Sequence, residues 1–389
     1  MRTTVVALVC LGLGFGAGFL AWEKKEPRSR ASAQRADPSR VPEEAVATPV
    51  APPVEDMVVE VPAETPVSKE RDAALAWLQR IAPERFGRFD RDALRHLVEL
   101  DLSRMTLDAA DLAHLKHLPA LRALKLDRTG IADDALAEIG AITKLESLTL
   151  TGNAITDAGM AHLSNLRALE EIALNGTTIG DAGMAALKDV AGLRIVKMDN
   201  TKITDETIRM LQGKPIERLG VGATNVTDEG LDLMRGFKLK ELSLYRNGHI
   251  TDAGMRHLQE QGDLETLMIR GLKLTETGLS HLRHLRSLRE LNASIVMDDA
   301  SMEHLAQLKT LRRLHLYSNP DISDAGLAHI RELTGLEALS LQFTGMTDAS
   351  VAYLKDMKSL RVVDFRGTKV TPAAADAFQA AHPGCRVLR

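Results

Sequence analysis

The feature that most constrains the fold is a motif that recurs about every 24 residues from residue 97 to the C-terminus of the 389-residue chain. Leu145–Ala168 reads LESLTLTGNAITDAGMAHLSNLRA, and Leu336–Ser359 reads LEALSLQFTGMTDASVAYLKDMKS. Both fit the frame L-x-x-L-x-L-x-x-[NT]-x-[IM]-T-D. A unit this short cannot bury its apolar face alone, so neighbouring units must stack. The period therefore predicts a solenoid and not a set of compact domains.

The repeated units are nearly constant in length, and the frame can be followed without a break. Length changes fall in the turn after the expected strand, where insertions and deletions are best tolerated. A last edge strand is expected near residues 383–389. The units begin at Leu97, Leu121, Leu145, Leu169, Leu193, Ile216, Leu239, Leu264, Leu288, Leu311, Leu336 and Leu360.

Within a unit, the pattern changes from that of a strand to that of a helix. Positions 3 to 7 alternate polar and apolar residues, as in Ser147–Thr151, which is typical of a strand with one buried face. Position 9 is often Asn or Thr, which can satisfy backbone groups at the turn. Thr-Asp then suits a helix start, and Leu or Met at spacing three gives that helix a buried stripe. The sequence predicts an α/β right-handed solenoid, a horseshoe with a parallel β-sheet on the concave face and helices on the convex face.

The segment I-T-D-x-G-[LM], together with the leucine frame, resembles the cysteine-containing subfamily of leucine-rich repeats. The cysteine that names the subfamily is replaced here by Asn or Thr, as at Asn153 and Thr177. The resemblance covers about three quarters of the chain and implies the fold. It leaves function open, because one scaffold serves many partners. The subfamily occurs in F-box-type adaptors, but no F-box-like segment precedes the repeats, so a ubiquitin-ligase adaptor is not favoured.

Three segments precede the repeats. Residues 1–26 contain an uncharged run from Thr3 to Trp22, long enough for a membrane helix and followed by Lys24 and Lys25. We expect a single-pass anchor with the repeat domain outside the cytoplasm, as in bacterial envelope proteins; a cleaved signal peptide and a secreted protein are the alternative. Residues 27–67 hold eight of the 14 prolines and are expected to be a disordered linker. Residues 68–96 are expected to form a helical N-terminal cap.

Candidate sites for chemistry are explained by the repeat itself. An Asp column that includes Asp157 and Asp205 suits helix starts better than a calcium ladder, and a His column that includes His257 and His281 lacks a full zinc ligand set. No catalytic motif is present, so neither an enzyme nor a cofactor nor a metal site is expected. A net charge of −4 offers no basic field for nucleic acid.

The informative positions are those that the repeat leaves free, namely 3, 5, 7 and 8 on the expected concave surface. They are small or charged in the first five units. From the seventh unit they become aromatic and cationic, in a chain with 3% aromatic residues. Such side chains are enriched in binding hot spots. The predicted partner-binding residues are Tyr245, Arg246, Met268, Arg270, His315, Tyr317, Phe343 and Arg366.

These observations favour a non-catalytic scaffold, tethered to a membrane, that binds a protein or peptide on its concave face. A glycan is a less favoured ligand. A purely structural envelope spacer is the rival interpretation, in which the aromatic concave residues have no function.

Overall fold

The computed structural model describes residues 66–295 and 297–389. The predicted anchor, residues 1–26, and nearly all of the predicted linker, residues 27–67, lie outside the described residues. Within the described ranges, every helix is too short or too polar to cross a membrane.

A single sheet runs through the whole repeat region, and neighbouring units contribute neighbouring strands in chain order. All pairings are parallel, and equivalent positions face one another, as Ser147 does Glu171. Each strand has three residues, so it covers positions 3 to 5 and is shorter than the predicted run to position 7. The strands are β1 (Glu99–Asp101), β2 (Ala123–Lys125), β3 (Ser147–Thr149), β4 (Glu171–Ala173), β5 (Ile195–Lys197), β6 (Arg218–Gly220), β7 (Glu241–Ser243), β8 (Thr266–Met268), β9 (Glu290–Asn292), β10 (Arg313–His315), β11 (Ala338–Ser340), β12 (Val362–Asp364) and β13 (Arg386–Leu388).

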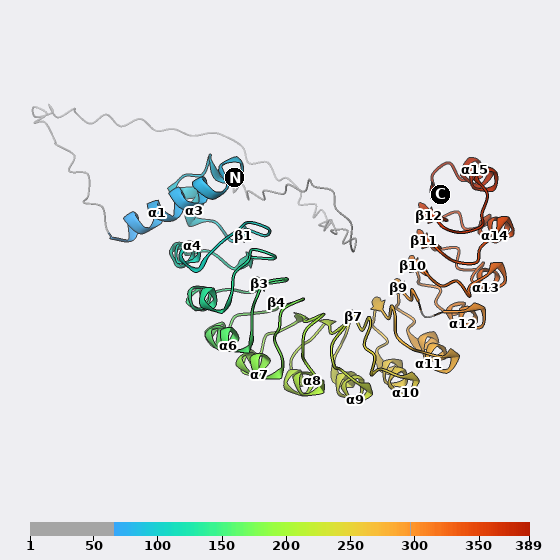
Figure 1. The fold of residues 1–389 in the computed structure, drawn as a ribbon, viewed down its shortest axis with the longest axis horizontal. Helices are drawn as coiled ribbons and strands as arrows, with labels where there is room; N and C mark the ends of the chain where they lie inside the picture. The colour runs from blue at the N-terminus through green and yellow to red at the C-terminus, as the bar shows by residue number, and fades with distance from the viewer. Residues whose placement is uncertain (1–65, 296) are drawn as a thin grey trace, which may run out of the picture. The chain divides into compact units, whose positions relative to one another are not determined.

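Helices return the chain from one strand to the next. In the repeat region they line the outer side of an arc whose inner side is the sheet (Figure 1). The α-helices are α1 (Pro66–Ile81), α2 (Pro83–Phe86), α3 (Arg91–Arg95), α4 (Ala109–Leu112), α5 (Leu136–Gly140), α6 (Asp157–Met160), α7 (Asp181–Met184), α8 (Asp205–Leu211), α9 (Asp228–Leu233), α10 (Asp252–Met255), α11 (Glu276–Ser280), α12 (Asp299–Leu305), α13 (Asp324–His329), α14 (Asp348–Leu354) and α15 (Pro372–Ala381). Short 3₁₀ helices extend several of them, at Leu115–His117, Asp133–Ala135, Ala161–Asn165, Ala185–Leu187, Met234–Gly236, Arg256–Glu260 and His281–His284.

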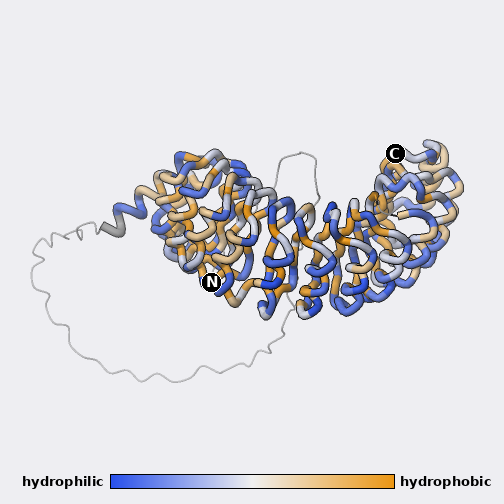
Figure 2. Tube along the Cα trace, turned by 60° about the horizontal axis from the view of Figure 1, so that its bottom comes forward, coloured by the Kyte–Doolittle hydropathy of each residue, from blue (hydrophilic) through white to orange (hydrophobic). Residues whose placement is uncertain are grey.

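The core is one continuous aliphatic column between sheet and helices. Leu148, Leu150 and Leu163 of a single unit have no exposed surface, and equivalent residues repeat along the column. Figure 2 shows the same alternation, with hydrophobic segments recurring in each coil of the repeat region. The predicted solenoid with its parallel sheet and its outer helices is therefore confirmed. The final strand expected near residues 383–389 is β13, which pairs with β12.

At the N-terminal end, helices α1 to α3 lie against the first unit. Trp77 of α1 is buried, donates a hydrogen bond from Nε1 to Asp111 Oδ1 at 2.8 Å and stacks on His114 with ring centroids 5.4 Å apart. Helix α1 begins at Pro66, inside the predicted linker, since proline suits the first turn of a helix. Pro83 follows the end of α1 and also begins α2.

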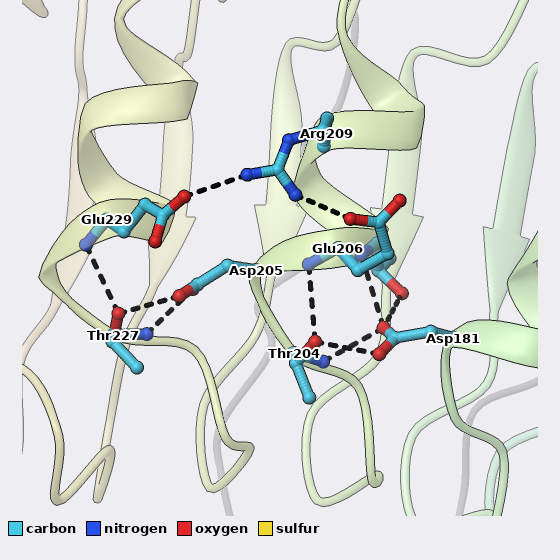
Figure 3. Close-up of polar contacts among 8 residues, drawn as sticks. Asp181, Thr204, Asp205, Glu206, Arg209, Thr227 and Glu229 are labelled. Atoms are coloured by element: carbon cyan, nitrogen blue, oxygen red, sulfur yellow. Dashed lines mark hydrogen bonds and ion pairs between the residues drawn. The ribbon is translucent and has the colours of Figure 1, made fainter.

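The Thr-Asp pairs join many of the successive units, as Figure 3 shows for Asp181 with Thr204 and Asp205 with Thr227. Thr204 caps its own helix by accepting a hydrogen bond from the Glu206 amide, as predicted. The Asp carboxylates do more than favour their own helix. Asp181 accepts hydrogen bonds from the Thr204 amide at 3.0 Å and hydroxyl at 2.7 Å in the following unit. Asp205 binds Thr227 in the same way.

This Asp ladder explains the glycine that lies two residues after several of these Asp residues, as Gly254 does after Asp252. A Cβ on Gly254 would lie 2.8 Å from Cγ of Asp228 in the preceding unit, inside van der Waals contact. The ladder is interrupted after α11, where Glu276 replaces Asp and faces His304 at 3.5 Å. The carboxylate oxygens of the ladder are used by hydrogen-bond donors, which does not fit a row of calcium sites.

A second ladder lies in the turn after the strands. Asn153 accepts hydrogen bonds from the amides of Thr129 and Gly130 in the preceding unit, each at 3.0 Å. Its amide nitrogen donates to the Leu126 and Leu150 carbonyls. At Thr177, where threonine occupies position 9, the hydroxyl donates to the Leu174 carbonyl of its own unit. The predicted role of position 9 is therefore confirmed, and asparagine is the residue that spans two units.

Candidate functional site

Position 8 of every unit adopts a left-handed backbone conformation. It therefore belongs to the turn that follows the strand. Glycine would suit this conformation, yet eight of the positions hold other residues, and a β-branched one such as Ile295 (φ 64°) is unfavourable there. The positions form a row that we call the left-handed ridge. Its members are Arg104, Arg128, Gly152, Gly176, Asn200, Ala223, Arg246, Gly271, Ile295, Ser318, Phe343 and Gly367.

Tyr245 lies at position 7 of the seventh unit and covers a gap left by glycine in the sixth. A Cβ on Gly222 would clash with the Tyr245 ring and would lie 2.9 Å from Oδ1 of Asp199. A Cβ on Gly220 would lie 2.6 Å from Oδ2 of the same carboxylate. The two glycines therefore allow the Tyr245 ring and the Asp199 carboxylate to pack against the backbone of strand β6 and its turn.

Asp199 is the most perturbed acid of this surface. Burial raises the pKa of its carboxyl to about 6, although a hydrogen bond from the Gly222 amide, at 2.6 Å, opposes the rise. Burial also raises the pKa of the Tyr245 hydroxyl, and the nearby Asp199 carboxylate adds to that effect. Perturbed groups gather at functional sites, because burial that costs stability is retained where it serves binding or chemistry.

Arg270 and Tyr317 are brought together across an intervening unit. The guanidinium carbon lies 5.2 Å from the Tyr317 ring centroid, a cation–π contact. The residue between them at position 7 is Ser294, which is small and fully buried, so the arginine side chain can cross it. Tyr245 occupies position 7 of the neighbouring unit, whose strand β7 pairs with β8, and the positive charge of Arg270 acts on its hydroxyl. Three of the eight predicted residues therefore form one cluster, Tyr245–Arg270–Tyr317.

Two other predicted residues are engaged by acids of the chain itself. Arg366 forms an ion pair of 2.6 Å with the buried carboxylate of Asp364. His315 lies 3.5 Å from Glu290, and hydrogen bonding by His315 and Arg313 lowers the pKa of that carboxyl despite its burial. These cations are less available to a partner than the sequence suggested.

The remaining predicted residues lie around the cluster. Met268 is the last residue of β8 and is half-buried. Arg246 and Phe343 are exposed members of the left-handed ridge, and Phe343 rests over Gly367 with 62% of its surface exposed. Among the described side chains, neither Tyr245 nor Tyr317 packs against the aliphatic core. Packing therefore does not explain these aromatic residues.

Sequence reasoning placed Asp199 on the concave surface but not in the candidate site, and it missed Gly220, Gly222 and Ile295. The pair of glycines at positions 5 and 7 of one unit was a visible signal, because no other unit has both. Nothing in the sequence indicated that Ile295 is left-handed. Glycine is the usual sign of this conformation, and most positions of the left-handed ridge hold another residue.

No group of three His, Cys, Asp or Glu side chains within residues 66–295 and 297–389 is arranged to hold a metal ion. Two histidines of the outer helices have local partners instead. His257 lies 3.0 Å from Asp232, and His281 contacts Gln259.

Comparisons with known proteins agree with this architecture. A family model described as Leucine Rich repeat matches residues 141–164. An internalin of Listeria monocytogenes is 19% identical, with a TM-score of 0.54 over 80% of this chain and 94% of its own. A structure of the yeast Rad7 and Elc1 complex contains a chain that is 19% identical, with a TM-score of 0.60 over 82% of this chain and 90% of that chain. At this identity the likeness shows the fold. The chain therefore has the leucine-rich repeat fold.

Proposed function

We propose that this chain is a non-catalytic scaffold that binds a protein or peptide on the inner surface of its seventh to eleventh units. The observation that carries the proposal is the Tyr245–Arg270–Tyr317 cluster, which lies on the sheet side and outside the core. Tyrosine and arginine are the residue types that dominate binding energy at protein interfaces. The similar yeast chain is described in a complex with Elc1, which is consistent with a binding role for this fold.

The contrast along the surface supports the location. Positions 5 and 7 of the third unit are Thr149 and Thr151, whereas the tenth unit has His315 and Tyr317 at the same positions. The backbone of both units is alike, so the difference is one of side chains only. A partner that contacts these side chains would therefore bind the seventh to eleventh units in preference to the first five.

The test is affinity capture with the full chain from the envelope of its native host, followed by equilibrium binding of the captured protein. Tyr245→Ala and Tyr317→Ala should each weaken that binding by about tenfold or more, as expected of hot-spot residues. Thr151→Ala is the matched control at position 7 and should leave binding unchanged. Full binding by both tyrosine variants would remove the site assignment. The absence of any saturable partner would favour the structural spacer.

We also propose that residues 1–26 anchor the chain in a membrane and that the repeats lie outside the cytoplasm. The support is the uncharged run from Thr3 to Trp22. Protease added to intact cells should digest the repeats, and the N-terminal segment should remain in the membrane fraction. Recovery of the mature chain in the medium would instead indicate signal cleavage.

A further inference from the structure

The Arg270 guanidinium is held in place without an anion. Its Nε is buried and, within the part of the chain that the structure describes, lacks a hydrogen-bond acceptor. The guanidinium lies over the Tyr317 ring face. No carboxylate of the described residues forms an ion pair with it. A partly desolvated cation without an acceptor is costly, so such an arrangement favours an incoming anion.

Two other cations of the same surface are matched within the chain. Arg366 is paired with Asp364 at 2.6 Å, and Lys125 contacts Glu99 at 2.5 Å. Arg270 differs because its neighbours at positions 5, 7 and 8 carry no acid. In the seventh to eleventh units these positions hold Ser243, Tyr245, Arg246, Met268, Arg270, Gly271, Asn292, Ser294, Ile295, His315, Tyr317, Ser318, Ser340, Gln342 and Phe343.

The first five units carry both signs at the same positions. Asp101, Asp127 and Asp199 lie there beside Arg104, Lys125, Arg128 and Lys197. An anionic ligand would meet carboxylates at these positions in that half, but none in the seventh to eleventh units. The absence of acids at the positions around Arg270 therefore favours a negatively charged ligand group at this place on the surface.

The left-handed ridge adds an apolar component beside Arg270. The large hydrophobic residues exposed within the described ranges are Val98, Ile295 and Phe343, and the last two belong to the ridge. They occupy the ninth and eleventh units, so two strand spacings, about 10 Å, separate them along the sheet. Each holds a bulky side chain in water on a left-handed backbone, a cost that the fold does not require because glycine serves at Gly271 and Gly367.

We propose that this surface binds a peptide segment of a partner protein that carries a carboxylate next to large apolar side chains. The carboxylate accepts hydrogen bonds from the Arg270 guanidinium, and the apolar side chains pack on Ile295 and Phe343. The Tyr317 ring holds the guanidinium in position for this contact. This inference rests on the proposed function and gives the chemical class of the partner.

The probe is a displayed library of random twelve-residue peptides, selected on the full chain. Selected peptides should be rich in Asp or Glu next to Leu, Ile, Phe or Trp. For one synthetic peptide of this kind, Arg270→Gln should weaken binding about tenfold or more, and changing the peptide's Glu to Gln should do the same. The two changes together should weaken binding little more than either one, because they remove the same contact.

Two variants control for folding and for general charge effects. Arg270→Lys keeps the charge but loses the planar stack on Tyr317, so it should recover only part of the binding. Arg128→Gln removes an exposed ridge arginine in the second unit and should have no effect. Circular dichroism of each variant shows that the solenoid is intact.

The outcomes separate this inference from the proposed function. The carboxylate contact is overturned if the selected peptides are not enriched in acids, or if the effects of Arg270→Gln and of the peptide's Glu-to-Gln change are additive. If Tyr245→Ala and Tyr317→Ala still abolish binding of such peptides, the proposed site stands. A selection that yields no peptide for this surface also overturns the inference, while the captured protein partner decides the proposed function independently.

Discussion

The Asp ladder allows a quantitative test because two of its members differ only in how many hydrogen bonds they accept. Asp181 accepts four, from the amides and hydroxyls of Thr204 and Thr207. Asp157 accepts one, from the Gly180 amide, since the next unit has glycine where threonine is usual. Both begin a helix, so replacing either with alanine removes the same favourable charge from the first turn.

The expected difference follows from this count. A net hydrogen bond contributes about 0.5–1.5 kcal/mol, so Asp157→Ala should cost about 1 kcal/mol in free energy of unfolding and Asp181→Ala about 2–4 kcal/mol. Thr207 is fully buried, so Asp181→Ala leaves its hydroxyl without an acceptor. Thr207→Val should therefore destabilise the native chain but be neutral or stabilising when combined with Asp181→Ala.

Urea denaturation followed by circular dichroism measures these free energies. In a solenoid the weakened contact lies between the fourth and fifth units, so the unfolding of Asp181→Ala should also broaden or split. Burial raises the pKa of the Asp181 carboxyl in part, but the four hydrogen bonds outweigh it and lower the pKa overall. The stabilisation by Asp181 is therefore present above the unfolded value near 3.8 and is lost as pH falls through the lower folded value. Equal costs for the two alanine variants, or the same effect of Thr207→Val in both backgrounds, would refute the ladder as a source of stability.

Three further variants test other features, each by the free energy of unfolding. Gly254→Ala should destabilise by about 1–3 kcal/mol because its Cβ displaces the Asp228 carboxylate, whereas Gly262→Ala, which has open space around its Cβ, should be neutral; equal effects would contradict the packing argument. Ile295→Gly should stabilise by about 0.5–1 kcal/mol, since relief of left-handed strain exceeds the entropy cost of glycine; a loss of stability would show that the side chain packs. Asp199→Asn should be more stable than the native chain by about 2 kcal/mol at pH 7, and the two should be equally stable near pH 4. The reason is that the Asp199 carboxyl has a folded pKa of about 6, above its unfolded value of 3.8, so the native chain loses stability as pH rises from about 4 to 6. A difference independent of pH would rule out the buried charge as its cause.

The sequence was sufficient for features that depend on neighbours along the chain. The leucine frame determined the stacking of units, because an apolar stripe must be covered whatever the partner. Thr204 could be predicted to cap its helix, since that contact lies within two residues. The change from Thr151 to Tyr245 and Tyr317 at position 7 was visible because the repeat fixes which positions are free.

The candidate site depended on contacts between units, and the sequence could not show which of those contacts form. Arg270 meets Tyr317 across a whole unit, while Arg366 turns to Asp364 two residues away, although both are arginines at position 7. The partner of each arginine depends on which carboxylates and aromatic rings come within reach when the repeat units stack.

The repeat period by itself therefore determined the solenoid and the rows of side chains that face its inner surface. Only the tertiary structure decided that the Asp column joins successive units, that position 8 is left-handed and that burial raises the pKa of Asp199 to about 6. The physical reason is distance in the chain. A cap or a strand forms among adjacent residues, whereas these contacts join groups about 23 residues apart, and their geometry exists only after the units have stacked.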